Sequence, residues 1–221
     1  MTFDFDLLGE IWPLLLQGTI VTLEATAVGF LLSLVFGGVL AMLMRLPSRA
    51  AATIARLVMD FFRATPLLVQ LYFLFFVLPS FGVSLPPFTT GVIALGLHYG
   101  AYAAEAYRAG LAAVPKGQWE AAISLNYSRY RMYRHVVLPQ ALPPVTPALG
   151  NIFIAMLKDT PVLSAITVTE LMFVANAIGS ERFQYTEPVT AAAIIYLVLS
   201  LAAAGLLRVF ERFAYRLERA R

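Results

Sequence analysis

The chain contains no cysteine, and charged side chains make up only 13% of its 221 residues. The absence of cysteine excludes a disulfide framework, a cysteine-bound metal and thiol chemistry. The shortage of charge is more informative, because ordinary globular chains carry about 25% charged residues. With 60% hydrophobic residues and a mean hydropathy of +0.77, the sequence predicts an all-α protein embedded in a lipid bilayer.

Five segments are expected to be transmembrane helices, because about 20 mostly apolar residues cross the hydrocarbon layer. They are 18–44, 58–78, 88–114, 142–157 and 189–209. The fourth is shorter and continues from the helix before it. A further apolar segment, 161–177, contains Thr167, Thr169 and Glu170. It can be interpreted as a sixth span or as an interfacial or re-entrant helix.

The distribution of basic residues argues against a sixth span. Cytoplasmic flanks of membrane proteins collect Lys and Arg. With five spans and the N-terminus outside, all but Lys158 and Arg182 of the 16 basic residues lie at the cytoplasmic side, and the C-terminus is cytoplasmic. A sixth span would move the C-terminal arginines across the membrane. Because the basic residues flank apolar segments, the net charge of +3 does not indicate a nucleic-acid partner.

No internal repeat or low-complexity tract divides the chain. We expect a short extracytoplasmic N-terminal segment at 1–17, one membrane domain at 18–207 and a cytoplasmic tail at 208–221. The N-terminal segment is acidic, and no basic residue precedes Arg45. A cleavable signal peptide needs a positive first region, so the first span is expected to be retained.

The segment 120–139, EAAISLNYSRYRMYRHVVLP, is amphipathic and then basic, although it lies between apolar segments. Apolar and amide side chains recur at helical spacing on one face of it and of the residue before it, namely Trp119, Ala122, Ile123 and Asn126. Such a face can press into a groove on a partner protein. The alternative interpretation is an ordinary loop helix that lies at the membrane interface.

The spacing inside this segment resembles the signature of bacterial ATP-binding-cassette (ABC) import permeases. That signature is Glu-Ala-Ala, three residues, Gly, nine residues, then Ile-x-Leu-Pro. Here Glu120 to Ala122 are followed at that spacing by Asn126 in place of Gly, and by Val136, in place of Ile, and Pro139. Asparagine is among the residues that best tolerate the left-handed conformation of a helix end, so it can replace Gly at modest cost.

Three further segments resemble the polar amino-acid uptake branch of these permeases, which includes histidine, glutamine and arginine permeases. They are RATPLLVQLYFLFF at 63–76, with Ala64 in place of Gly, YGAYAAEAYRAGL at 99–111, and MLKDTPVLSAI at 156–166, with Asn151 before it and Pro161 in place of Ser. The sequence of 142–171 most resembles that of ectoine and hydroxyectoine permeases. It reads LPPVTPALGNIFIAMLKDTPVLSAITVTEL.

The resemblance implies the type I ABC importer permease fold with a cytoplasmic coupling helix, in the bacterial inner membrane. It implies three partners, namely a cytoplasmic ABC ATPase dimer, a second permease subunit (identical or homologous) and an extracytoplasmic solute-binding protein. The residues it assigns to ATPase coupling are Trp119, Glu120, Ala121, Ala122, Asn126 and Pro139.

The chain is expected to be a transport subunit and not an enzyme. A phosphate-binding loop needs Gly-Lys followed by Ser or Thr. The two lysines, Lys116 and Lys158, follow Pro115 and Leu157 instead. ATP and Mg are therefore expected in the partner ATPase, and no cofactor is expected in this chain. The alternative function is a stand-alone channel or secondary carrier for small polar solutes, although many carriers show internal repeats.

Ionisable residues inside membrane segments are candidates for function, because charge in hydrocarbon is costly. Polar side chains line one face of the third span at spacings of four, three and three, namely His98, Tyr102, Glu105 and Arg108. Glu105 and Arg108 can form an ion pair that orients helices, or they can face the pathway or a subunit interface. The two histidines lie too far apart in sequence to predict a metal site.

Lys158 and Asp159 lie at the outer end of the fourth span and need separate partners, because adjacent helical residues do not face each other. Lys158 can simply snorkel to the interface, or the pair can receive a zwitterionic solute or hold an outer gate. The predicted substrate pathway comprises His98, Tyr102, Glu105, Lys158, Asp159 and Thr160. Mixed charge suits a small zwitterion, such as a polar amino acid or ectoine.

Overall fold

The computed structural model describes residues 3–219, and side chains as far as residue 209. The described residues contain no strand, so the predicted all-α class is confirmed. The α-helices are α1 (Phe5–Leu43), α2 (Arg49–Ala64), α3 (Leu67–Tyr72), α4 (Pro87–Ala113), α5 (Lys116–Ser124), α6 (Arg129–Met132), α7 (Leu138–Asp159), α8 (Leu171–Arg182) and α9 (Thr186–Arg219). Short π or 3₁₀ segments are η1 (Phe73–Val77), η2 (Leu78–Phe81), η3 (Tyr133–Val137) and η4 (Thr160–Ile166).

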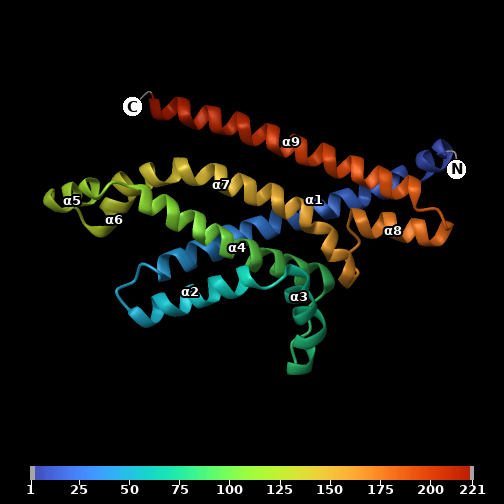
Figure 1. The fold of residues 1–221 in the computed structure, drawn as a ribbon, viewed down its shortest axis with the longest axis horizontal. Coiled ribbons are helices and arrows are strands. Elements are labelled where there is room, and N and C mark those ends of the chain that lie inside the picture. Colours follow the sequence, from blue (N-terminus) through green and yellow to red (C-terminus); the bar gives the residue numbers. More distant parts are fainter. Residues whose placement is uncertain (1–2, 220–221) are drawn as a thin grey trace.

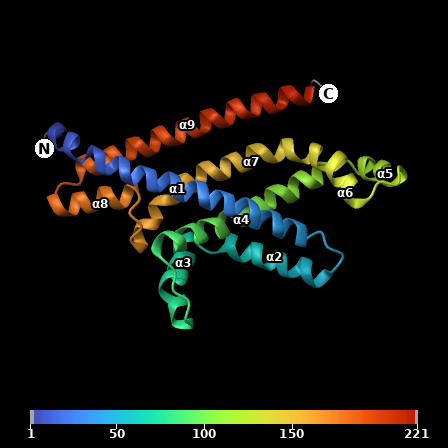
Figure 2. The ribbon, with the colours of Figure 1, turned by 180° about the vertical axis from the view of Figure 1, so that it is seen from behind.

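The four longest helices, α1, α4, α7 and α9, run roughly along the long axis of the molecule (Figure 1). At one end, here called the α8 end, α8 lies beside the beginnings of α1 and α9. At the other, the α5 end, the hairpin of α5 and α6 follows the end of α4, and α9 ends on the same side (Figure 1; Figure 2 from behind). Ala220 and Arg221 of the predicted C-terminal tail lie outside the described residues, as do Met1 and Thr2.

The centre of the bundle is the long contact between α1 and α4. Glycines allow the two backbones to approach closely, as is common between membrane helices. A Cβ atom on Gly37 would lie 2.7 Å from the carbonyl oxygen of Gly100, and one on Gly96 would lie 2.4 Å from the Leu32 side chain. The positions of these glycines therefore determine where α1 and α4 cross.

The predicted continuous helix over 58–78 is wrong. The helix ends at Ala64, and the pieces on either side, Arg49–Ala64 and Leu67–Phe81, are bent by 105°. Pro66 explains the break, because a residue before proline avoids helical geometry and proline has no N–H to donate. Thr65 is accordingly extended, with ψ 139°. Gln70 Nε2 braces the break by donating to the Phe62 carbonyl (2.9 Å), the Thr65 carbonyl (3.0 Å) and Thr65 Oγ1 (2.7 Å).

Among the described residues, three helices are long and apolar enough to cross a membrane, or four if the bent pair is counted as one span. They are Phe5–Leu43, the continuous stretch Arg129–Ile166 and Thr186–Val209. The 27 residues of α4 are long enough, since about 20 suffice, but glycine, threonine, histidine and tyrosine make it less apolar. The count of five spans therefore stays a prediction.

The ambiguous segment 161–177 folds as a 3₁₀ turn followed by α8. The 12 residues of α8 are about 18 Å long at 1.5 Å per residue, too short to cross the hydrocarbon. Instead α8 packs on α1 and α9 around buried residues such as Leu15, Leu171 and Ala192. By length, this segment is not a sixth span, which agrees with the interpretation drawn from charge.

Candidate functional site

The segment that carries the permease signature forms a compact hairpin at the α5 end. Pro115 precedes α5, and the helix ends at Ser124. Asn126 adopts the left-handed conformation, with φ 55°, as expected for a residue in the place of Gly. Its N–H donates to the Ile123 carbonyl at 2.8 Å, and the Tyr127 N–H donates to the Ala122 carbonyl at 3.0 Å. The turn that the signature predicts at this position is therefore present.

The predicted contact face of α5 divides into two parts, which corrects the prediction. Ala122 is only 2% exposed, and Trp119 packs against the edge of Tyr133 with their ring centroids 5.6 Å apart. The Arg45 guanidinium lies 4.9 Å from the Trp119 ring centroid. Trp119 packs against a cluster of Val114, Val137 and Ala141, and together with the buried Ala122 it anchors α5 to its own chain.

The other members of the predicted coupling set face outward. Glu120, Ala121 and Asn126 are exposed, as is Pro139, which lies in the first turn of α7. Two apolar neighbours that the coupling set omits are also exposed: Ile123 at 66% and Leu125 at 68%. The exposed surface of this segment thus consists of small, acidic and aliphatic side chains, whereas Trp119 packs against the rest of the chain.

The polar face of α4 is partly as predicted. His98 lies against Tyr99 and Tyr102, with ring centroids 5.3 and 5.4 Å away. Farther along α4, Glu105 accepts hydrogen bonds from the Arg108 Nε (3.1 Å) and terminal nitrogen (2.5 Å), so the predicted pair is present.

The sequence did not reveal that α2 contributes a second cation to this face. The Arg63 guanidinium lies 5.6 Å from the Tyr102 ring centroid and 3.8 Å from a Glu105 carboxylate oxygen. Glu105 therefore lies between two arginines. All three charged side chains are at least about one-third exposed, and their cluster has one positive charge in excess. The available signal was the charge of Arg63 near the start of a mostly apolar segment that also contains Asp60.

The end of α7 forms a corner at which neighbouring side chains point to different helices. The Asp159 carboxylate accepts a hydrogen bond of 2.6 Å from the Tyr99 hydroxyl on α4. Thr160 is fully buried and its hydroxyl lies 3.2 Å from the Tyr196 hydroxyl on α9. Lys158 is exposed. Of the three predicted pathway residues here, only Asp159 joins the polar face of α4.

Two buried polar atoms lack a hydrogen-bond partner within the part of the chain that the structure describes. They are Oε1 of Gln70 and Nδ1 of His98. Since buried polar atoms are nearly always paired, these two leave hydrogen-bonding capacity beside the α2–α3 break and the middle of α4. The sequence singled out His98 but not Gln70, Tyr99 and Tyr196. These three side chains are neutral, and their local sequence does not indicate which residues they contact.

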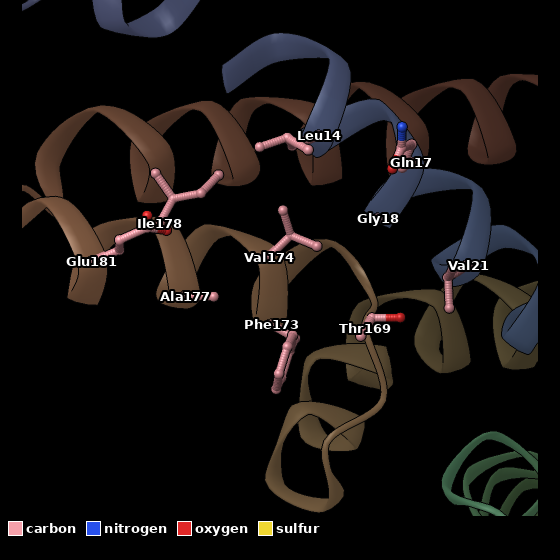
Figure 3. A pocket seen from close by; sticks show the side chains of 10 residues that line it. All are labelled: Leu14, Gln17, Gly18, Val21, Thr169, Phe173, Val174, Ala177, Ile178 and Glu181. Atoms are coloured by element: carbon pink, nitrogen blue, oxygen red, sulfur yellow. The ribbon is translucent and has the colours of Figure 1, made fainter. Parts of the chain in front are cut away.

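A separate cavity of about 340 Å³ opens at the α8 end. Figure 3 shows that side chains of α1, including Leu14 and Val21, line one side, and side chains of α8, including Phe173 and Val174, line the other. Its lining is largely apolar and includes none of the predicted pathway residues. The cavity is therefore distinct from the polar face of α4.

Comparison with known proteins gives a consistent result. Residues 11–214 match the family described as binding-protein-dependent transport system inner membrane component. The chain is 45% identical to a probable amino-acid ABC transporter permease protein, y4tG, of Sinorhizobium fredii, over 91% of this chain and 87% of that protein. It is 38% identical to the L-cystine transport system permease protein TcyB of Bacillus subtilis, over 91% of this chain and 86% of that protein.

Solved structures agree with the predicted fold. A crystal structure of an amino acid ABC transporter with histidines matches with a TM-score of 0.89 at 39% identity, over 96% of this chain and 99% of that one. An inward-facing structure of the MetNI methionine ABC transporter matches with a TM-score of 0.80 at 19% identity, over 93% and 98%, which shows a shared fold alone. The predicted type I permease fold is confirmed, and the chain belongs to the family of inner-membrane components of binding-protein-dependent transport systems.

Proposed function

We propose that the chain imports a polar amino acid or a zwitterionic amino-acid derivative, as the permease subunit of an ATP-driven, binding-protein-dependent importer. Membership of the family makes it a transport subunit and not an enzyme. The names of the relatives that are 45% and 38% identical, an amino-acid and an L-cystine permease, support this class of solute. Ectoine or hydroxyectoine is a narrower proposal for the solute, which rests on the resemblance of the sequence of 142–171 to ectoine and hydroxyectoine permeases.

The observation that carries the solute class is the alternation of charge along the polar face of α4. Asp159 is held against Tyr99, and the excess positive charge of Arg63 and Arg108 lies around Glu105. Tyr99 and Glu105 are about 9 Å apart along a helix that rises 1.5 Å per residue. A path that offers an anion and then cations suits a solute that carries both charges, since a path for a strong anion would show one sign.

The partners are proposed from the α5 end. The exposed surface of Glu120, Ala121 and Ile123 suits a groove on a cytoplasmic ABC ATPase dimer, which would bind the ATP and Mg. In this proposal the α5 end and the C-terminus lie in the cytoplasm, and the N-terminus lies outside the inner membrane. A second permease subunit, identical or homologous, completes the pathway, and an extracytoplasmic solute-binding protein delivers the solute. The domain limits 18–207 and the tail 208–221 stay predictions.

Uptake measurements test the proposal. The chain is expressed with its ATPase and binding protein in a host that lacks related transporters. Labelled solute should be displaced by zwitterionic amino acids or ectoine and not by sugars or phosphate, and Asp159→Asn should lower uptake at least about tenfold, the loss typical of a hydrogen bond to a charged group. Efficient uptake of a sugar would overturn the solute class. Uptake that needs no ATPase would instead support a stand-alone channel or carrier.

A further inference from the structure

A chain of hydrogen bonds leads from the corner at the end of α7 to the first turn of α8. The Thr160 hydroxyl shares its one proton between the Leu157 carbonyl (2.8 Å) and the Tyr196 hydroxyl (3.2 Å), and Tyr196 donates to Glu170 Oε2 at 2.7 Å. The Glu170 carboxylate then accepts from the Met172 N–H at 2.8 Å and the Phe173 N–H at 2.7 Å. Three separate elements, η4, α9 and α8, are therefore joined through one tyrosine and one glutamate.

Glu170 is unusual because it is fully buried and is paired only with neutral donors. No salt bridge within the described residues involves it. Two backbone N–H groups at the start of α8 and one phenol satisfy its oxygens, and the N-terminus of a helix favours a negative charge. A buried carboxylate with neutral donors alone is held in place strongly, because any movement that removes one donor leaves part of the charge unpaired.

The base of this network is fixed on α1. The Leu171 N–H donates to Thr22 Oγ1 at 3.1 Å. A Cβ on Gly18 would lie 2.9 Å from the Leu171 Cα, so the backbones of α1 and α8 already touch. The first turn of α8 cannot shift toward α1, and a shift away from it breaks the Thr22 hydrogen bond.

The two residues of the corner tie this network to the polar face of α4. Asp159 points to Tyr99 on α4, whereas Thr160 points to Tyr196 on α9. Because the residues are adjacent, a backbone rotation that frees Thr160 also turns the Asp159 carboxylate. The position of α8 and the direction of Asp159 are therefore linked through a short stretch of rigid backbone.

We propose that Tyr196 and Glu170 are positioning residues, which hold the corner so that the Asp159 carboxylate faces the solute pathway. This rests on the function proposed above. Neither residue contacts the solute. Each acts through Thr160, and the same contacts make the α8 end and the pathway move together.

The test is a double-mutant cycle on the reconstituted importer with its ATPase and binding protein. Tyr196→Phe removes only the hydroxyl, which contacts both Thr160 and the Glu170 carboxylate, and we expect the maximal uptake rate to fall at least about tenfold, the effect of losing a hydrogen bond to a charged group. KM should not change, because the binding protein captures the solute. Tyr99→Phe, which frees the corner from its other side, should have a similar effect. Tyr185→Phe, at a half-exposed ring, is the matched control.

The double variant decides between positioning and a merely structural role. If both tyrosines act through the orientation of one corner, the Tyr99→Phe/Tyr196→Phe chain should be no slower than the slower single variant, because contacts within one network are not additive. Losses that multiply would mean independent structural roles and would overturn the proposal. If Asp159→Asn leaves uptake unchanged, Asp159 is not part of the solute pathway. That measurement is separate from the double-mutant cycle, so failure of the proposed function can be distinguished from failure of the positioning role.

A second measurement does not depend on transport. Since the chain has no cysteine, spin labels can be attached to cysteines placed at Ala177 on α8 and Leu201 on α9. Tyr196→Phe and Glu170→Gln should broaden the distance distribution between these labels, whereas Glu181→Gln, at an exposed glutamate of α8, should not. Thr160→Ser, which keeps the hydroxyl, should behave as the unmodified chain, and Thr160→Val should not. An unchanged distribution in Tyr196→Phe would overturn the proposal.

Discussion

The two ends of the bundle are stabilised by different kinds of contact. At the α5 end, Trp119 lies between the Arg45 guanidinium and Tyr133, and aliphatic side chains such as Ile123 are left exposed. At the α8 end, the polar groups of Glu170 and Tyr196 are paired inside the chain. The α5 end is therefore held mainly by aromatic and cation–π contacts, whereas the elements of the α8 end are joined by buried hydrogen bonds. Both ends expose apolar side chains, Ile123 at one and Phe183 at the other.

The largest expected effect concerns which end of the bundle faces the cytoplasm. A reporter that is active only in the cytoplasm should be fully active when fused after Arg221 and silent when fused after Ser180. The physical reason is the retention of Lys and Arg on the cytoplasmic side. Fusion activity is compared at equal protein amounts. A silent reporter after Arg221 would reverse the two ends and remove the basis for an ATPase at the α5 end.

A charge in the exposed surface of α5 should abolish transport. Ala121→Arg would bury a guanidinium without a partner in the proposed groove, and an unpaired buried charge costs several kcal/mol. We expect uptake to fall at least about a hundredfold on that basis, while the amount of chain in the membrane stays the same. Ala113→Arg, at an exposed alanine that precedes α5, is the control. Normal uptake by Ala121→Arg would exclude Ala121 from the coupling surface.

Crowding the contact between α1 and α8 should destabilise the α8 end. Gly18→Val places a side chain against the backbone of Leu171, and we expect the free energy of unfolding to fall by about 1–3 kcal/mol, the usual effect of overpacking. Thermal unfolding in detergent measures the change. Gly9→Val, where no atom lies within 4 Å of the added Cβ, should leave the unfolding temperature unchanged. Equal effects of the two substitutions would show that the contact is not tight.

The smallest effect is expected where Arg45 contacts Trp119 of α5. Arg45→Ala removes a cation–π contact with Trp119, worth about 0.5–1 kcal/mol at an exposed site. Uptake should therefore fall only about threefold, and ATP hydrolysis should lose some of its stimulation by solute. Arg49→Ala, at an exposed arginine at the start of α2, serves as the control. If both variants lose uptake equally, general positive charge at this end matters more than the contact with Trp119.

The fold and the family were predictable from the sequence because their signals are local. The spacing from Glu120 to Pro139 identified the hairpin and the left-handed turn at Asn126, and the low charge identified the membrane class. The break at Pro66 was missed because hydropathy sums the residues of 58–78 without regard to the donor that proline lacks. Helical periodicity grouped Trp119 with Ala122, Ile123 and Asn126 on one face of α5, but it could not tell that Ala122 is buried against its own chain whereas Ile123 and Asn126 are exposed.

The polar contacts of the proposed pathway were harder to predict, because each depends on tertiary structure. Glu105 and Arg108 were paired correctly since they lie one turn apart on the same helix. Arg63, Tyr99 and Tyr196 are at least 26 residues from the groups they contact, and nothing in their local sequence indicates these partners. Thr160 was assigned to the pathway by its neighbours in sequence, but its buried side chain turns to α9.

The brace at the α2–α3 break determines what it takes to bend the chain there. Pro66 cannot donate to the Phe62 carbonyl, so a straight helix would leave that group without its backbone partner. The Gln70 amide supplies the missing donor. Any change in the angle between α2 and α3 therefore requires the Gln70 amide to give up its carbonyl partners and the buried α3 side chains Leu67 and Leu71 to shift in the core. Gln70→Leu would remove the polar part of this brace and leave the Phe62 carbonyl without the Gln70 donor.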